Sequence, residues 1–260
     1  MQGTWRTHAE MSPDSLLPLP QGAKIHPVAA ATISVNPFTA DRMMLDFTKL
    51  EKGDWVVQNG ANSAVGQNVI QIARIRGFKT VNILRDRPNF DEVKAALEAL
   101  GADIVIKDTD LVNREVVKSI TTQAPNIRLA LNCVGGKVTS NMVRLLGSDA
   151  YIVTYGAMAR EPLMLPAIPL LFKNLTAKGF WVSKWHETHP KERKEELAWL
   201  CEQFQNGNLK AIDHEEVRWA GRGVDEEVGW SRFREAMSKL RQGQSGKKFV
   251  LTNYDEEDLP

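Results

Sequence analysis

Hydrophobic and polar positions follow two different periods along the middle of the chain. Short runs rich in Val, Ile and Leu alternate with longer segments in which apolar residues recur every three or four positions. The first pattern predicts strands buried on both faces and the second predicts helices. The expected strands are 54–58, 80–85, 103–108, 128–136, 150–156 and 175–183, and the expected helices are 65–76, 90–101, 114–123, 138–147 and 165–174. This alternation predicts an α/β fold with a Rossmann-type, doubly wound parallel sheet.

The two ends of the chain differ from the middle. Residues 1–28 predict a strand and a proline-rich connection, and a helix over 28–49 is broken near Asn36, because the residue before a proline avoids the α region. The later elements expected are a helix at 188–206, a charged loop at 213–230, a helix at 230–243 and a strand at 247–253. We therefore expect three parts, namely 1–34, the Rossmann domain at 35–186, and 187–260.

Composition narrows the class of protein. Hydrophobic residues make up 43% and charged residues 25% of the chain, which is ordinary for a soluble globular protein. The net charge of +1 gives no strong field toward nucleic acid or an anionic membrane, and no apolar run approaches the length of a membrane span. We therefore expect neither a nucleic-acid partner nor a membrane span.

Cysteine and histidine spacing predicts no metal site. Two cysteines are too few for a disulfide framework or a zinc cluster, and Cys133 lies in an apolar run where a buried, inert thiol is usual. His186 and His189 are three residues apart, but Pro190 follows them and no third ligand is in place.

The connection between the first strand and its helix is the first candidate site. It runs from Gly60 to Gly66 and lacks the G-x-G-x-x-G spacing. The first N–H groups of a helix have no intrahelical partner, so this turn can hold a pyrophosphate; the alternative is a plain connection. The residues expected there are Asn62, Ser63, Ala64, Val65 and Gly66.

The end of the second strand bears on which nucleotide binds. Arg85, Asp86 and Arg87 follow it. In a dinucleotide fold this strand end lies over the adenosine ribose, where an acid favours a free 2′-hydroxyl and an arginine accommodates a 2′-phosphate. Two arginines around one acid favour NADPH over NADH as the cofactor. Because Asp86 is an acid, NADH remains an open alternative.

Two later strand ends complete the candidate site. One group follows the strand at 150–156 and the other is expected inside the last strand. The carboxyl ends of parallel strands are where a nicotinamide ring is held, whereas the alternative for aromatic residues is the core. The residues are Tyr155, Gly156, Ala157 and Met158, and then Phe180, Trp181 and Val182.

Seven motifs in one order resemble a known family. They are GTWRT, VNPFTA, the NSAVGQ turn with VIQIA, NILRDRP, LALNCVGGK, VTYGAM and KGFWVS. Together they are similar to mitochondrial trans-2-enoyl thioester reductases of the medium-chain dehydrogenase/reductase superfamily. The similarity runs from about Gly3 to Trp185.

The resemblance implies a cofactor, a set of contacts and a second domain. It implies NADPH, no metal, and a GroES-like catalytic domain of which 1–34 and 187–260 are remnants. The implied contacts are Asn36, Asn62, Ser63, Ala64, Val65, Gly66, Arg85, Asp86, Arg87, Tyr155, Gly156, Ala157, Met158, Phe180, Trp181, Val182 and Lys247, with Lys248 as the neighbouring alternative to Lys247.

The resemblance also implies an activity and partners. The family reduces trans-2-enoyl thioesters, carried on CoA or an acyl carrier protein, in mitochondrial fatty acid synthesis. Superfamily members commonly dimerise by joining edge strands of two nucleotide domains, and residues 180–185 are the expected edge here. The family implies a mitochondrial location, whereas the chain as written shows no presequence and would be cytoplasmic.

The family's catalytic tyrosine precedes the GTWRT strand, so the chain is expected to be truncated at its N-terminus. Tyr151, Tyr155 and Tyr254 do not match that tyrosine's motif, and we expect no catalytic residue here. Two alternatives remain open: an inactive module that binds NADPH, and an oxidoreductase resembling quinone reductases.

Overall fold

The computed structural model describes residues 9–13, 16–221, 223–242 and 248–253. The chain divides into two compact units. One is Ser34–Arg193, and the other is built from the parts of the chain up to Ile33 and from Lys194 onward. The strand expected before residue 9 and the predicted contact Lys247 lie outside the described residues.

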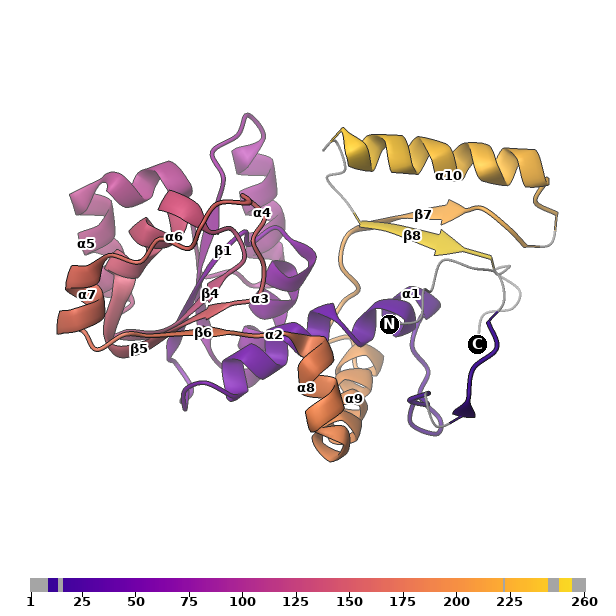
Figure 1. Ribbon diagram of the computed structural model, residues 1–260, viewed down its shortest axis with the longest axis horizontal. Coiled ribbons are helices and arrows are strands. Elements are labelled where there is room, and N and C mark those ends of the chain that lie inside the picture. Colours follow the sequence, from indigo (N-terminus) through magenta and orange to yellow (C-terminus); the bar gives the residue numbers. More distant parts are fainter. Residues whose placement is uncertain (1–8, 14–15, 222, 243–247, 254–260) are drawn as a thin grey trace. The chain divides into compact units, whose positions relative to one another are not determined.

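The unit Ser34–Arg193 is built on a six-stranded parallel sheet (Figure 1). Its strands are β1 (Trp55–Asn59), β2 (Lys79–Leu84), β3 (Ile104–Lys107), β4 (Ile127–Asn132), β5 (Leu146–Thr154) and β6 (Thr176–Gly179). Their order is β3-β2-β1-β4-β5-β6, so the chain runs outward in both directions from the neighbours β1 and β4. This confirms the predicted doubly wound Rossmann-type sheet, whose ligand crevice lies where the strand order reverses.

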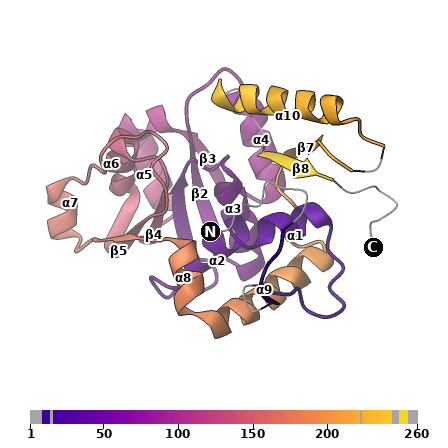
Figure 2. The same ribbon diagram turned by 45° about the vertical axis from the view of Figure 1, so that its right-hand side comes forward.

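Helices cover both faces of this sheet, as Figures 1 and 2 show. The helices and 3-10 turns of the unit are α2 (Asn36–Leu45), α3 (Ala64–Arg76), α4 (Phe90–Leu100), η2 (Asp108–Val112), α5 (Arg114–Gln123), α6 (Gly136–Met142), η3 (Val143–Leu145), α7 (Ala167–Phe172) and α8 (Val182–Thr188). On one face Ile120 and Met142 pack against the strands, and on the other Ile70 and Leu97 do so. Strands covered on both faces read as continuous apolar runs, which is why the pattern identified them.

The last strand of the sheet is shorter than predicted. β6 ends at Gly179, and the N–H of Phe180 makes one more bond, of 2.9 Å, to the oxygen of Thr154. Because β5 itself ends at Thr154, residues beyond Phe180 have no strand to pair with there. Val182 begins α8 instead, so the prediction that Phe180, Trp181 and Val182 lie in a strand, with 180–185 as the sheet edge, is wrong.

The other unit is described by itself. It contains α1 (Pro27–Ile33), most of α9 (Pro190–Gln205), β7 (His214–Arg218), α10 (Glu226–Arg241) and β8 (Lys248–Thr252). β7 and β8 form a parallel pair joined through α10. The prediction of a loop over 213–230 is therefore wrong at both ends. The charged segment HEEVR forms the strand β7. Asp225 caps α10 by accepting from the N–H groups of Glu227 and Val228, so this helix begins earlier than predicted.

Candidate functional site

The turn after β1 is shaped by one cap and one close contact. Ser63 Oγ accepts the N–H of Gly66 at 3.1 Å and so caps α3. A Cβ atom on Gly66 would lie 2.5 Å from the backbone oxygen of Ala61, so only glycine fits there. The N–H groups of Ala64 and Val65 belong to the first turn of α3 and have no partner inside the helix, which makes this end of α3 suited to an anion.

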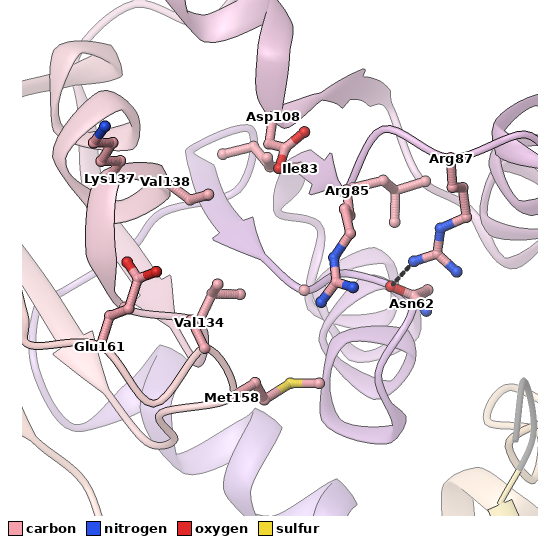
Figure 3. Close-up of a pocket in the computed structure, with 14 residues that line it drawn as sticks. Asn62, Ile83, Arg85, Arg87, Asp108, Val134, Lys137, Val138, Met158 and Glu161 are labelled. Carbon is pink, nitrogen blue, oxygen red and sulfur yellow. Dashed lines mark hydrogen bonds between the residues drawn. The ribbon is translucent and has the colours of Figure 1, made fainter. Parts of the chain in front are cut away.

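A cavity of about 580 Å³ opens over the carboxyl ends of β1, β2 and β4 (Figure 3). Four predicted residues line it, namely Asn62, Arg85, Arg87 and Met158. Gly60, the first residue of the predicted turn, lines it too. The other lining residues, which the sequence did not single out, are Ile83, Leu84, Asp108, Val134, Gly135, Lys137, Val138, Ala159 and Glu161. The fold thus brings the turn, the arginine pair and the segment after β5 to one crevice.

The two arginines give this cavity its cationic wall. Figure 3 shows both guanidinium groups directed toward the side of the cavity where Asn62 lies. Arg87 Nη2 donates to Asn62 Oδ1 at 3.3 Å, which ties the end of β2 to the turn after β1. Arg87 Nε is buried and has no hydrogen-bond partner among the described residues. An arginine held in this way is oriented and still has donors left for a ligand.

Asp86 is predicted beside these arginines but faces elsewhere. It is not among the residues that line the cavity, and its carboxylate pairs with Lys107 at 2.9 Å. Asp86 is the residue that kept NADH possible as the cofactor in the sequence analysis. In the structure it forms an ion pair with Lys107, the last residue of the neighbouring strand β3.

Behind the turn, the segments after β4 and β5 pack together. The N–H of Tyr155 donates to the oxygen of Asn132 at 3.0 Å, and that of Met158 donates to the oxygen of Cys133 at 2.8 Å. Cys133 is 3% exposed, which confirms its predicted burial. A Cβ atom on Gly156 would lie 3.2 Å from Cys133 Cβ, so a small residue is needed at this crossing.

Tyr155 lies next to this packing with a buried hydroxyl. Its Oη has no hydrogen-bond partner in the part of the chain that the structure describes. Burial, and then the nearby Cys133 thiol, raise the pKa of Tyr155 well above its usual value, so the phenol stays protonated at neutral pH.

An amide network that the sequence did not single out supports the crevice. Asn59 Nδ2 donates to Asn132 Oδ1 at 2.8 Å, and Asn59 Oδ1 accepts the N–H of Cys133 at 2.8 Å. Asn132 Oδ1 also accepts from the hydroxyl of Thr139 at 2.7 Å. Both asparagines end buried strands, which is the one sequence signal that marks them. Because these bonds join β1, β4 and α6, they fix the spacing of the strand ends that carry the site.

The remaining predicted residues lie outside the cavity lining. Asn36 is buried at the start of α2, and its Nδ2 has no partner among the described residues. Trp181 is 64% exposed, Phe180 packs its ring against Phe47, and Val182 is buried at the start of α8. These four residues are not among those that line the cavity, and neither are residues 63–66 and 155–157, so the role of all of them as cofactor contacts stays a prediction.

The described residues show neither a metal-binding cluster nor a membrane-spanning helix. They contain no group of three or more His, Cys, Asp or Glu side chains arranged to hold a metal ion. None of the helices described is both long enough and apolar enough to cross a membrane.

The chain is similar to one protein family model and to several curated proteins. The family model described as "Zinc-binding dehydrogenase" matches residues 64–200, more than half of the chain. The mitochondrial enoyl-[acyl-carrier-protein] reductase of Homo sapiens is 43% identical over 210 residues, covering 80% of this chain and 56% of that protein. The enzyme of the same name from Schizosaccharomyces pombe is 36% identical over 251 residues, covering 95% of this chain and 66% of that protein.

Solved structures agree with this assignment. The Etr1p/NADP/crotonyl-CoA complex has a TM-score of 0.77 at 33% identity and covers 86% of this chain and 61% of its own. A putative NADPH:quinone reductase from Bacillus thuringiensis has a TM-score of 0.75 at 21% identity, which shows a shared fold alone. The chain spans between about half and two thirds of the length of the curated relatives described here. The chain belongs to the zinc-binding dehydrogenase family, the medium-chain dehydrogenase/reductases, in which its relatives are mitochondrial enoyl thioester reductases.

Proposed function

We propose that this chain binds NADPH in the crevice beside β1 and β2, and that the protein reduces trans-2-enoyl thioesters to acyl thioesters. The observation that carries the proposal is the pair Arg85 and Arg87 at the end of β2, facing a cavity that also holds the turn residue Asn62. Guanidinium groups suit a 2′-phosphate, and the start of α3 suits the pyrophosphate. The related solved complex contains NADP and crotonyl-CoA, which supports the same cofactor and substrate class here.

Unsatisfied polar atoms support the fit of a dinucleotide. Arg87 lines the cavity, and its Nε is buried and lacks a hydrogen-bond partner among the described residues. Buried polar atoms are normally paired, so an orphan at the cavity wall supports a ligand there. We propose that the turn residues from Asn62 to Gly66 hold the phosphates, and that Tyr155 to Met158 border the nicotinamide side.

The chain's own groups then bind and orient the cofactor. When bound, NADPH supplies a hydride for the β-carbon of the enoyl thioester. The two arginines fix the adenosine end by charge, and the α3 N-terminus fixes the phosphates. Tyr155, with its buried hydroxyl and raised pKa, is unsuited to donate the proton that the enolate-like product requires.

The test of the cofactor assignment replaces both arginines. Arg85→Ala with Arg87→Ala should weaken NADPH binding at least about a hundredfold, because each charged hydrogen bond contributes about 1.5–3 kcal/mol. NADH binding should change little, since NADH has no 2′-phosphate. Titration of both cofactors by fluorescence measures this, and equal weakening of the two would contradict the assignment.

A second measurement separates the enzyme from a module that only binds NADPH. The purified chain is mixed with NADPH and crotonyl-CoA, and the absorbance of the reduced nicotinamide is followed, with the double arginine variant as control. Oxidation that this variant loses supports the reductase. Binding without oxidation favours the inactive module, and oxidation only with a quinone favours the quinone reductase alternative.

We further propose a homodimer formed along the β6 edge of the sheet. β6 has a neighbour on one side, and the adjacent α7 carries Ile168, Leu171 and Phe172 at 72%, 73% and 78% exposure. Three large apolar side chains so exposed on one short helix are typical of an interface. A related structure is an Etr1p/Etr2p heterodimer, which supports assembly as a pair.

The location proposed is mitochondrial, supported by the names of the relatives.

A further inference from the structure

The acid between the two cavity arginines is held outside the cavity by the neighbouring strand end. Asp86 Oδ1 lies 2.9 Å from Lys107 Nζ. The backbone N–H of Asp86 donates to Asp108 Oδ1 at 2.9 Å. Side chain and backbone of Asp86 are therefore both attached to the residues where β3 ends.

Lys107 is itself fixed in place. In the parallel register of β2 and β3, Lys107 lies opposite Leu84, the last residue of β2. The ammonium group of Lys107 lies 5.2 Å from the ring centroid of Phe90, the first residue of α4. The backbone N–H of Lys107 donates to Asp110 Oδ2 at 3.0 Å. The hydrogen bond to Asp86 raises the pKa of Lys107, so the lysine keeps its charge. The position that holds Asp86 is thus set by the sheet register.

Asp108 lines the same cavity but on a different side from the guanidinium groups. Figure 3 shows Asp108 beside Ile83, whereas the guanidinium groups of Arg85 and Arg87 extend toward Asn62. Asp108 therefore lies apart from the arginine donors, and the Asp86 carboxylate is paired with Lys107.

We propose that Lys107 and Asp108 are specificity-determining residues, which hold the Asp86 carboxylate away from the ribose 2′ position and leave that position to Arg85 and Arg87. The inference rests on the proposed function. A carboxylate next to a 2′-phosphate repels it, whereas one next to a free 2′-hydroxyl accepts its hydrogen bond. Lys107 thereby sets the preference for NADPH over NADH without contacting either cofactor.

The test uses Lys107→Gln in the full chain, with dissociation constants measured for NADPH and NADH. Release of Asp86 should tighten NADH binding and weaken NADPH binding, so that the NADPH preference falls about tenfold, which corresponds to 1.4 kcal/mol. The matched control is Lys94→Gln, because Lys94 also pairs with a carboxylate, Glu98, but on α4; it should leave the preference unchanged.

A double-mutant cycle separates positioning from simple charge. In an Asp86→Asn background, Lys107→Gln should have no further effect on the preference. The same effect in both backgrounds would mean that Lys107 acts through its own charge, and this would overturn the proposal, as would an unchanged preference in Lys107→Gln. If the unmodified chain shows no NADPH preference, or keeps it after loss of Arg85 and Arg87, the proposed function fails and the inference fails with it.

Discussion

At the scale of single residues, the buried hydroxyl of Tyr155 links the site to the pH dependence of stability. Its pKa is raised in the folded chain above the ordinary value of 10.0, mainly by burial. The folded state therefore binds this proton more tightly than the unfolded state does. The stability that results is complete below pH 10 and is lost as the pH rises above 10 toward the raised pKa.

Tyr155→Phe should remove that loss. Above pH 10 the free energy of unfolding of the unmodified chain should fall by up to about 1.4 kcal/mol per pH unit more steeply than that of the variant. Below pH 9 the variant should be at least as stable as the unmodified chain, because it lacks a buried hydroxyl that has no partner among the described residues. Urea unfolding at several pH values measures this, with Tyr151→Phe as control; parallel curves for Tyr155→Phe and the unmodified chain would contradict it.

At the scale of elements, the start of α3 depends on backbone contact. Replacing a glycine inside a helix with alanine usually stabilises the helix by about 1 kcal/mol. Gly66→Ala should instead destabilise the chain by about 1–3 kcal/mol, because its Cβ would meet the backbone oxygen of Ala61 at 2.5 Å. NADPH binding should weaken as well, since the turn must move.

The matched control for this substitution is Gly179→Ala in β6. A Cβ atom on Gly179 would have its nearest contact at 3.9 Å, to the oxygen of Thr154, which is an ordinary distance. Chemical unfolding and NADPH titration compare the two variants. An increase in stability for Gly66→Ala would show that the turn and α3 are not in the close contact described.

At the scale of the whole molecule, the exposed residues of α7 predict the oligomeric state. Leu171→Asp with Phe172→Asp should convert a dimer into a monomer, because two charges at a paired apolar surface would be buried without partners. Sedimentation velocity at micromolar concentration measures the change. Val112→Asp is the control, since Val112 is similarly exposed, at 65%, in η2. A monomeric unmodified chain, or a dimer that survives the α7 substitutions, would contradict the proposed interface.

The elements that the sequence predicted best are those whose identity depends on local pattern. β1 and α3 match the predicted ranges within about a residue, and Gly77 ends α3 in the left-handed conformation. The helix α8 at 182–188 was missed because its start depends on a residue far away in the chain. β5 ends at Thr154, and beyond that point the chain after β6 has no partner strand. β7 was missed because its charged residues break the usual apolar alternation.

The sequence by itself determined the alternation of strands and helices, the ends of α3 and the cationic character of the β2 end, since each depends on residues close together in the chain. Only the tertiary structure decided that Asp86 pairs with Lys107 and that Tyr155 has a buried hydroxyl. It also decided that Asn62 and Arg87 meet across the crevice. These contacts join residues far apart in the chain, and they follow from the order and register of the strands, which local patterns of hydrophobic and polar residues do not specify.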